Sequence, residues 1–483
     1  MRTITFKGLF LTAVFMLLGC LAIQAADGGL ITKQITIKLD EAGTLSSKIG
    51  YNKKIQITNL KIVGEINGSD LQFVREMAGV NFYGGPVEGN LSVLDLSEAK
   101  IIKGGSFYYS PSGSYDKHYY TTDDTIGSYT FYRCRKLKSL KLPSGVTEIG
   151  SSAFEDCRDL TSLTIPSGVT EIGSSAFKGC TDLTSLSLPS GITEIGSSAF
   201  EDCRGLTSLT IPSGVTEIGS LTFYGCTGLT SLSLPSGVTE IGSSAFEDCS
   251  GLTSLSLPSG ITKIGSLTFY GCTGLTSLSL PSGVTEIGSS AFSGCTGLTS
   301  LSLPSSITEI GSSAFSGCTG LKDVSFYING DFETYLTKDH PCIEVGCGIK
   351  YYLNDEEITS IVVPSSVTTL GKYAFQKCSN LQSVYVSWPT PISAYKTFSE
   401  TNLGKCTLYV PQGTEQDYWL ANVWGDFGKI VEYDPTGIDK VTTSTDAKEL
   451  SRYSANGQRL SAPAKGLNIV KSSDGSVKKV AVQ

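Results

Sequence analysis

Histidine is nearly absent from this sequence, which has only His118 and His340 among its 483 residues. Ser-His-Asp and Cys-His catalysis both need a placed histidine, and neither of these two belongs to a catalytic motif. No phosphate-binding loop or G-x-G-x-x-G motif precedes a helix. These absences predict that the protein is not an enzyme. The remaining catalytic alternative is a site in the irregular segment 327–357, which contains His340.

Charge is also scarce, because Asp, Glu, Lys and Arg make up 17% of the chain and the net charge is −8. Nucleic-acid binding needs clustered Lys and Arg, so this class of partner is excluded. We also find no pattern that calls for a cofactor.

Long apolar runs are missing beyond the first 26 residues. Arg2 precedes the apolar run Phe10–Ile23, and small residues follow at Ala25 and Ala26. This order is typical of a secretory signal peptide, and the run is too short to span a membrane. Leu17–Cys20 also fits a lipobox, although the apolar run continues beyond the cysteine. We predict cleavage near Ala25 and a secreted or outer cell-surface protein, with a lipoprotein anchored through Cys20 as the alternative.

One 23-residue pattern fills about half of the chain. Leucines open successive copies at Leu137, Leu160, Leu183, Leu206, Leu229, Leu252, Leu275 and Leu298. Nine cysteines keep the same step from Cys134 to Cys318. A fixed period in this range indicates a solenoid of stacked coils, in which each coil buries its apolar face against its neighbours.

The copy that begins at Leu160 shows how each coil should fold. Leu163 and Ile165 share the inner face of a short strand, whereas Ser162 and Thr164 point outward. Proline follows and ends the strand. The rest of the copy supplies further interior residues, namely Val169, Ile172, Ala176, Phe177 and Cys180. Stacked copies therefore predict short parallel strands around a continuous core.

The motif L-x-x-L-x-L-P-x-x-[VI]-T-x-I-G-x-x-A-F-x-x-C recurs from Leu137 to Cys318. It resembles the bacterial leucine-rich repeats of the BspA-like type. The resemblance implies a leucine-rich-repeat solenoid with short parallel β-strands, and adhesion to extracellular-matrix proteins.

The segments that flank the repeats predict diverged caps and a small β C-terminal module. Leu91–Leu96 has the spacing of a degenerate first repeat strand, and a helix is expected from Asp70. The tail contains hairpin signals at Asn456-Gly457 and Asp474-Gly475. It resembles the C-terminal sorting modules of secreted bacterial proteins, and a generic small β module is the alternative.

We predict a signal peptide at 1–26, an N-terminal cap and aromatic-rich loop at 27–125, the solenoid at 126–326, an insertion at 327–357, last repeats and a C-terminal cap at 358–433, and a linker with the β module at 434–483.

Two regions are candidate partner-binding surfaces. Outward strand positions form a row of hydroxyl side chains: Ser162, Thr164, Ser185, Ser187, Ser208, Thr210, Ser231 and Ser233. In leucine-rich repeats this face contacts the partner, although Ser and Thr also simply keep an exposed sheet soluble. The second region is the aromatic-rich loop at 104–134, with Tyr108, Tyr109, Tyr119 and Tyr120. Such rings stack on a sugar or a partner's side chains, or instead cover the end of the core, and for the loop as a whole we favour the second interpretation.

Other repeated groups favour structural roles. We predict that the nine aligned cysteines are buried thiols, because equivalent side chains of stacked coils point the same way; serial disulfides are the alternative. Cys342 and Cys347 are predicted to form a local disulfide rather than a metal site. A column of acids, Glu148, Glu171, Glu194, Glu217, Glu240, Glu286 and Glu309, with Lys263 in one copy, is interpreted as a solvated stripe, and weak Ca²⁺ binding is the alternative.

The sequence therefore predicts a non-catalytic extracellular or cell-surface binding scaffold. Its partners would be host proteins, cells or glycans, bound through the repeat face and the inserted loops. The alternative is a structural spacer or surface-layer component without a specific ligand. Because the repeats are nearly identical, we expect specificity to lie in the loop at 104–134 and the insertion at 327–357.

Overall fold

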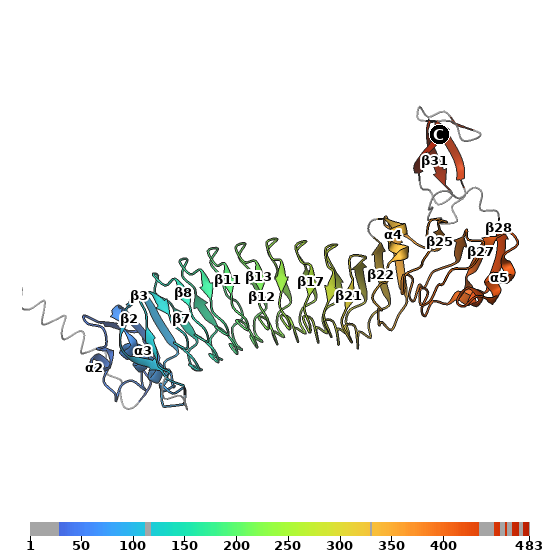
Figure 1. The fold of residues 1–483 in the computed structure, drawn as a ribbon. Coiled ribbons are helices and arrows are strands. Elements are labelled where there is room, and N and C mark those ends of the chain that lie inside the picture. The colour runs from blue at the N-terminus through green and yellow to red at the C-terminus, as the bar shows by residue number, and fades with distance from the viewer. Residues whose placement is uncertain are drawn as a thin grey trace, which may run out of the picture. The chain divides into compact units, whose positions relative to one another are not determined.

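The computed structural model describes residues 29–111, 117–328 and 331–433, together with four strands between 449 and 482 (Figure 1). It divides into two compact units. Unit 1 extends to Lys322 and includes Glu344–Gly346, and unit 2 contains Asp323–Ile343 and the chain from Cys347 onward. Parallel-strand coils build most of both units, which confirms the predicted leucine-rich-repeat solenoid.

Unit 1 begins with a cap that leads directly into the repeat sheet. Its elements are β1 (Ile35–Lys38), α2 (Leu45–Ile49), β2 (Asn59–Ile66), α3 (Gly68–Met77) and β3 (Val93–Ile101). Asn67 and Asp70 form a capping box at the start of α3, as expected of short polar side chains there. In β3, Leu94 pairs with Leu140 of the first regular copy. The degenerate first strand predicted at Leu91–Leu96 is therefore confirmed.

The repeat strands form parallel, in-register ladders. They are β7 (Ser139–Lys141), β9 (Ser162–Thr164), β12 (Ser208–Thr210), β14 (Ser231–Ser233), β16 (Ser254–Ser256), β18 (Ser277–Ser279) and β20 (Ser300–Pro304). From β9 to β18 each central leucine, such as Leu209, is buried between two exposed hydroxyl residues. Period-two alternation alone predicts this arrangement.

A second set of two-residue strands, which the sequence did not predict, lies on another side of each coil. Its members are β6 (Thr125–Ile126), β8 (Glu148–Ile149), β10 (Glu171–Ile172), β11 (Glu194–Ile195), β13 (Glu217–Ile218), β15 (Glu240–Ile241), β17 (Lys263–Ile264), β19 (Glu286–Ile287) and β21 (Glu309–Ile310). Pairing is interrupted before β13 and before β17. Both coils carry Thr where most copies have Ala, and these hydroxyls, Thr222 Oγ1 and Thr268 Oγ1, donate to Gly219 O and Gly265 O at 2.7 and 2.8 Å. Each break in the pairing of the second set of strands therefore coincides with a threonine in place of the smaller alanine.

A third set of hydrogen bonds, here called the corner ladder, joins the turns that precede each cysteine. Ser152 N donates to Ser174 O at 2.9 Å, Phe154 N to Ala176 O at 2.8 Å and Asp156 N to Lys178 O at 2.7 Å. The same three bonds recur at every junction up to the one that begins at Ser290. The first and last donors have positive φ, for example 55° at Ser152 and 61° at Asp156. Since Asp and Gly tolerate this conformation best, the residue before each cysteine of the ladder is almost always one of them.

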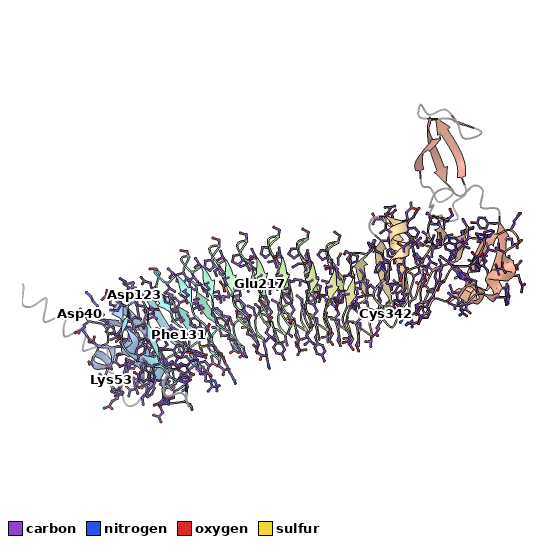
Figure 2. The ribbon with its side chains drawn as sticks, in the orientation of Figure 1. Asp40, Lys53, Asp123, Phe131, Glu217 and Cys342 are labelled. Atoms are coloured by element: carbon purple, nitrogen blue, oxygen red, sulfur yellow. The ribbon has the colours of Figure 1, made fainter. Side chains whose placement is uncertain are left out.

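The interior of unit 1 is a stack of phenylalanine rings beside a row of thiols. Phe131, labelled in Figure 2, begins the stack and Phe315 ends it; successive ring centroids lie 5.2–5.6 Å apart with planes within 12°. Cys203 Sγ donates to Phe177 O at 3.1 Å, and the aligned cysteines from Cys157 to Cys318 repeat this bond. The repeat therefore stacks identical groups on one another.

Unit 2 consists of less regular coils. It contains β22 (Asp323–Ile328), α4 (Phe332–Thr337), β23 (Ile349–Leu353), β24 (Glu356–Glu357), β25 (Ser360–Val363), β26 (Ser383–Val386), η1 (Leu403–Lys405), β27 (Thr407–Pro411), α5 (Glu415–Leu420), η2 (Trp424–Asp426) and β28 (Lys429–Tyr433). The strands β25, β26, β27 and β28 form a parallel sheet in chain order. Within the segment predicted as an insertion, β23 pairs in parallel with β22, so this segment forms a further coil rather than a protruding loop.

The C-terminal tail forms an antiparallel sheet of its own. Its strands are β29 (Glu449–Ser454), β30 (Arg459–Leu460), β31 (Gly466–Ser472) and β32 (Val477–Val482), in the order β30-β29-β31-β32. The antiparallel pairs β29/β30 and β31/β32 confirm the two predicted hairpins. The turn residues Asn456-Gly457 and Asp474-Gly475 themselves lie outside the described residues.

Candidate functional site

The hydroxyl face is the most extended regular surface of unit 1. All eight predicted residues are exposed on the same side of the repeat strands: Ser162, Thr164, Ser185, Ser187, Ser208, Thr210, Ser231 and Ser233. Register is kept from coil to coil, since Ser208 pairs with Ser231 and Thr210 with Ser233. The same pattern continues through β16, β18 and β20. The sequence therefore placed this row of side chains correctly on the outer side of the strands.

A shallow depression of about 500 Å³ lies on this face between two later coils. Its lining includes Ser254, Ser256, Ser277 and Ser279, with Leu257 and Leu280 at one side. These hydroxyls, with the partly accessible Leu257 beside them, offer both hydrogen bonds and apolar contact. Such a surface suits a neutral polar partner better than a charged one.

In the aromatic-rich loop, two of the four tyrosines predicted to bind a partner are buried. It forms β4 (Gly104–Tyr109) and β5 (Tyr119–Thr121), and β4 packs against α3. Tyr108 and Tyr109 are only 1% and 6% exposed, so neither offers a surface to a partner, and that prediction is wrong for both. Their rings fill the end of the core, where Tyr109 stacks on Tyr129. Tyr119 is half-buried and Tyr120 is 52% exposed, which leaves Tyr120 as the accessible ring of the four.

Arg75 is a buried residue that sequence reasoning missed. Its guanidinium donates to Tyr129 O at 2.8 Å and to Thr130 O at 3.0 Å. Burial lowers the pKa of Arg75, but a guanidinium stays charged at neutral pH. Tyr108 completes this contact, since its hydroxyl donates to Ser128 O at 2.9 Å. Because no coil precedes the first corner, these two side chains supply the donors that a preceding coil would have given.

The interior cysteines are thiols, as predicted. Those from Cys134 to Cys318 are free, and burial raises the pKa of Cys134 to about 11 and that of Cys226 to about 12. A protonated, enclosed thiol is a poor nucleophile and a poor metal ligand.

The predicted Cys342–Cys347 disulfide is wrong, because Cys342 is a free cysteine. The segment is held instead by Gln376, whose Oε1 accepts from Ile343 N at 2.8 Å.

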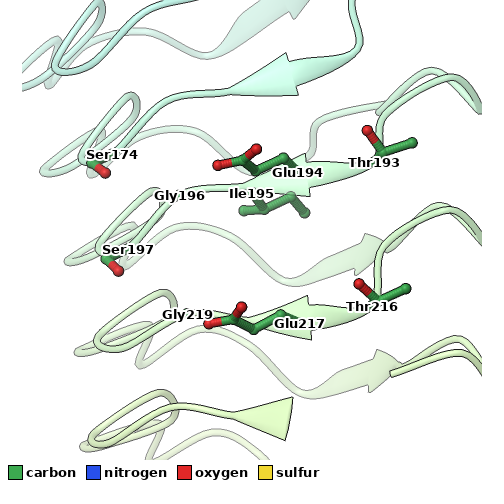
Figure 3. Close-up of a pocket in the computed structure, with 9 residues that line it drawn as sticks. All are labelled: Ser174, Thr193, Glu194, Ile195, Gly196, Ser197, Thr216, Glu217 and Gly219. Carbon is green, nitrogen blue, oxygen red and sulfur yellow. The ribbon is translucent and has the colours of Figure 1, made fainter. Parts of the chain in front are cut away.

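The acidic column follows the second set of strands. Figure 3 shows Glu194 and Glu217 on successive coils, beside a hollow of about 440 Å³ at the first interruption of that ladder. Burial, together with the charges of Glu194 and Glu148, raises the pKa of Glu171. Lys263 pairs with Glu286 at 2.6 Å and relieves the repulsion locally. Within the described ranges, no three His, Cys, Asp or Glu side chains lie close enough to share a metal ion.

His340 is a packing residue of unit 2. Its Nε2 lies 3.0 Å from Tyr335 O, and its ring centroid lies 4.2 Å from that of Tyr335. Burial lowers the pKa of His340, while the Tyr335 carbonyl and Asp339 act in the opposite direction.

A pH dependence of stability follows from this shift. Below about pH 6.5, the unfolded chain binds a proton that folded His340 resists, so stability is present above that pH and is lost as pH falls toward the lowered pKa. We expect the free energy of unfolding of unit 2 to fall between pH 7.5 and 5.5 (about one unit either side of that value), and to fall less in His340→Gln. Urea unfolding followed by tryptophan fluorescence measures this, because Trp388, Trp419 and Trp424 all belong to unit 2. His118→Gln, in unit 1, is the control; equal pH slopes in His340→Gln and the parent protein would contradict the prediction.

The coils, the buried leucines and the outward hydroxyl face together define a leucine-rich-repeat protein. The sequence matches the BspA type leucine-rich-repeat region, in six copies, over residues 100–230, 216–336 and 348–416. The chain belongs to this family, whose members are generally binding or scaffold proteins and are usually non-enzymatic. No curated protein matches the chain.

Several solved structures are similar to this chain. A leucine-rich-repeat protein from Bacteroides ovatus is 24% identical, with 71% of this chain and 84% of that chain covered and a TM-score of 0.42. A leucine-rich-repeat protein from T. pallidum is 38% identical, with 33% and 77% covered and a TM-score of 0.32. A leucine-rich cell surface protein from Faecalibacterium prausnitzii is 25% identical, with 63% and 89% covered and a TM-score of 0.34. In the described part of the chain, no helix combines the length and the apolar character needed to cross a membrane.

Proposed function

We propose that the protein is an adhesive binding scaffold that acts outside the cell, secreted or held at the outer surface. The observation that carries this proposal is the in-register hydroxyl face, which repeats one uncharged surface over many coils. Extracellular proteins or glycans on host or neighbouring cells are the partners that such a surface suits. The signal-peptide pattern in the first 26 residues supports an extracellular site of action.

Repetition makes this binding multivalent. Each coil offers the same pair of hydroxyl side chains, so a partner with repeated polar groups would engage several coils at once. Linked weak contacts raise the overall affinity well above that of one contact. Length of the face, rather than one unique pocket, would then set the strength of adhesion, and the exposed Tyr120 would add selectivity at one end.

Removing four coils tests the proposal directly. Deletion of residues 184–275 removes four periods of 23 and joins Leu183 to Thr276, which recreates a native sequence junction. We expect binding to immobilised extracellular-matrix proteins, or to a glycan array, to weaken at least about tenfold because contacts are lost from a multivalent face. Surface plasmon resonance with the full-length and shortened chains measures the change.

Matched charge substitutions separate the face from the length of the protein. Glutamates at Ser208, Ser231 and Ser254 place charge on the hydroxyl face, whereas glutamates at Thr170, Thr193 and Thr239 place equal charge beside the acidic column. We expect only the first set to weaken binding. Undiminished binding after the deletion would reject the hydroxyl face as the site, and absence of any partner would favour the structural spacer.

A further inference from the structure

The corner ladder of unit 2 ends in a row of unpaired backbone donors. At the last junction, Tyr373 N donates to Lys396 O at 2.9 Å, Phe375 N to Thr397 O at 2.9 Å and Lys377 N to Ser399 O at 2.8 Å. The donors that would continue the ladder are the N–H groups of Lys396, Phe398 and Glu400. Among the described residues, none of these three has a hydrogen-bond acceptor.

These donors keep the conformation of an interior corner. Lys396 and Glu400 have φ of 58° and 57°, as the first and last donors of the regular corners do. Phe398 still stacks on Phe375, with ring centroids 6.0 Å apart. The row is therefore preorganised to donate to three peptide carbonyls at the spacing of a further coil.

The first corner of unit 1 lacks a preceding coil, and side chains satisfy its backbone carbonyls. Tyr108 donates to Ser128 O and Arg75 donates to Thr130 O. A row of backbone N–H groups without acceptors in the protein is a template for another chain. Side chains thus satisfy the first corner of unit 1, whereas the N–H groups at the last corner of unit 2 remain available to acceptors of another chain.

A hollow of about 460 Å³ lies at this open row. It is lined by the corner around Lys396–Gly404 and, on the other side, by Val423 and Asp426. Val423 has φ 70° and ψ −44°, a strained conformation for a β-branched side chain. Buried Trp424 anchors this wall, since its indole N–H donates to Ile392 O at 2.6 Å. Strain of this kind is concentrated at binding sites.

We propose that this corner binds an extended peptide segment of a partner protein, which adds to the ladder as one more coil would. The acceptors would be neutral peptide carbonyls, because the hollow has two carboxylates, Glu400 and Asp426, and the Lys396 ammonium that also lines it lies over the rings of Tyr373 and Tyr395. Glu400 is paired with Lys377 at 3.3 Å, whereas Asp426 has no ion-pair partner in the described part of the chain. A Lys or Arg side chain of the bound peptide complements Asp426. This site is separate from the hydroxyl face and does not depend on the adhesion function.

Hydrogen–deuterium exchange of the full-length protein tests the proposal. The probe is a short acetylated and amidated peptide of alternating Lys and Ser. We expect it to slow amide exchange in residues 394–404 by about tenfold or more, since free N–H groups become hydrogen-bonded. The corner at 371–378 is the internal control, because its amides Tyr373, Phe375 and Lys377 are already bonded.

A charge reversal identifies the site. Asp426→Lys should weaken the lysine peptide by about tenfold and strengthen a matched glutamate peptide. Asp417→Lys, at an exposed acid of α5 outside the hollow, should change neither affinity. The proposal is overturned if the lysine peptide gives no protection, if Asp426→Lys leaves its affinity unchanged, or if a chitooligosaccharide protects these amides instead. If these amides become protected when the protein concentration rises without any peptide, the corner binds a second copy of the chain, and the proposal is also overturned.

Discussion

Phe200→Ala should lower the free energy of unfolding of unit 1 by about 3–5 kcal/mol. Phe200 is fully buried, and its ring centroid lies 5.5 Å from that of Phe177 and 5.6 Å from that of Phe223. In a solenoid each coil contacts only its neighbours, so a cavity here weakens the two interfaces that hold the coil in the array. Urea unfolding followed by circular dichroism measures the loss.

Graded and surface substitutions make this test specific. Phe200→Leu keeps most of the volume and should cost less than about 1.5 kcal/mol. Thr210→Ala, on the exposed hydroxyl face, should change stability by less than about 0.5 kcal/mol. If Phe200→Ala cost no more than Thr210→Ala, the ring stack would not be what stabilises neighbouring coils.

The regular coils were predictable because one physical requirement repeats in every copy. An isolated coil buries nothing, so the spacing of Leu163, Ile165 and Phe177 is meaningful only when copies stack. This reasoning placed the inner and outer strand positions and the thiol row correctly. Burial of identical groups at identical positions leaves little freedom for any other arrangement.

The corners and the caps were not predictable in the same way. The corner ladder depends on backbone conformation, and its sequence signal is only the Asp or Gly before each cysteine, such as Asp156 and Gly179. Tyr108 and Tyr109 bear out the favoured interpretation of the aromatic-rich loop as a cover for the end of the core, but the sequence did not reveal which rings stay accessible. The Cys342–Cys347 disulfide failed because close spacing in sequence does not reveal that Gln376 already holds the segment.

Arg75 illustrates a signal that was present in the sequence. It follows Leu71 by four residues and precedes Ala78 by three, which places it on the apolar face of α3. A charged residue on that face needs buried acceptors. The terminal corner of a solenoid provides them, because its carbonyls have lost the preceding coil.

Arg75→Met should therefore destabilise unit 1 by about 3 kcal/mol. Tyr129 O and Thr130 O would lose their charged donor, at about 1–3 kcal/mol each, and Asn81 O would lose a longer hydrogen bond of 3.4 Å. The relief of a buried charge offsets part of that loss, since no carboxylate of the described residues pairs with the guanidinium. Circular dichroism in urea gives the total effect, and amide exchange in residues 127–134 should accelerate more than in the central corners.

Two further variants decide whether the donor or the charge matters. Arg75→Lys keeps the charge but lacks the forked donor geometry, so its stability should lie between those of the parent protein and Arg75→Met. Arg133→Met removes an exposed arginine of the same corner, which lies 3.6 Å from Asp156, and should cost less than about 0.5 kcal/mol. If Arg75→Met and Arg133→Met were equally stable, the carbonyls of the first corner would not need the Arg75 donor. Unpaired backbone carbonyls would then be tolerated at this corner.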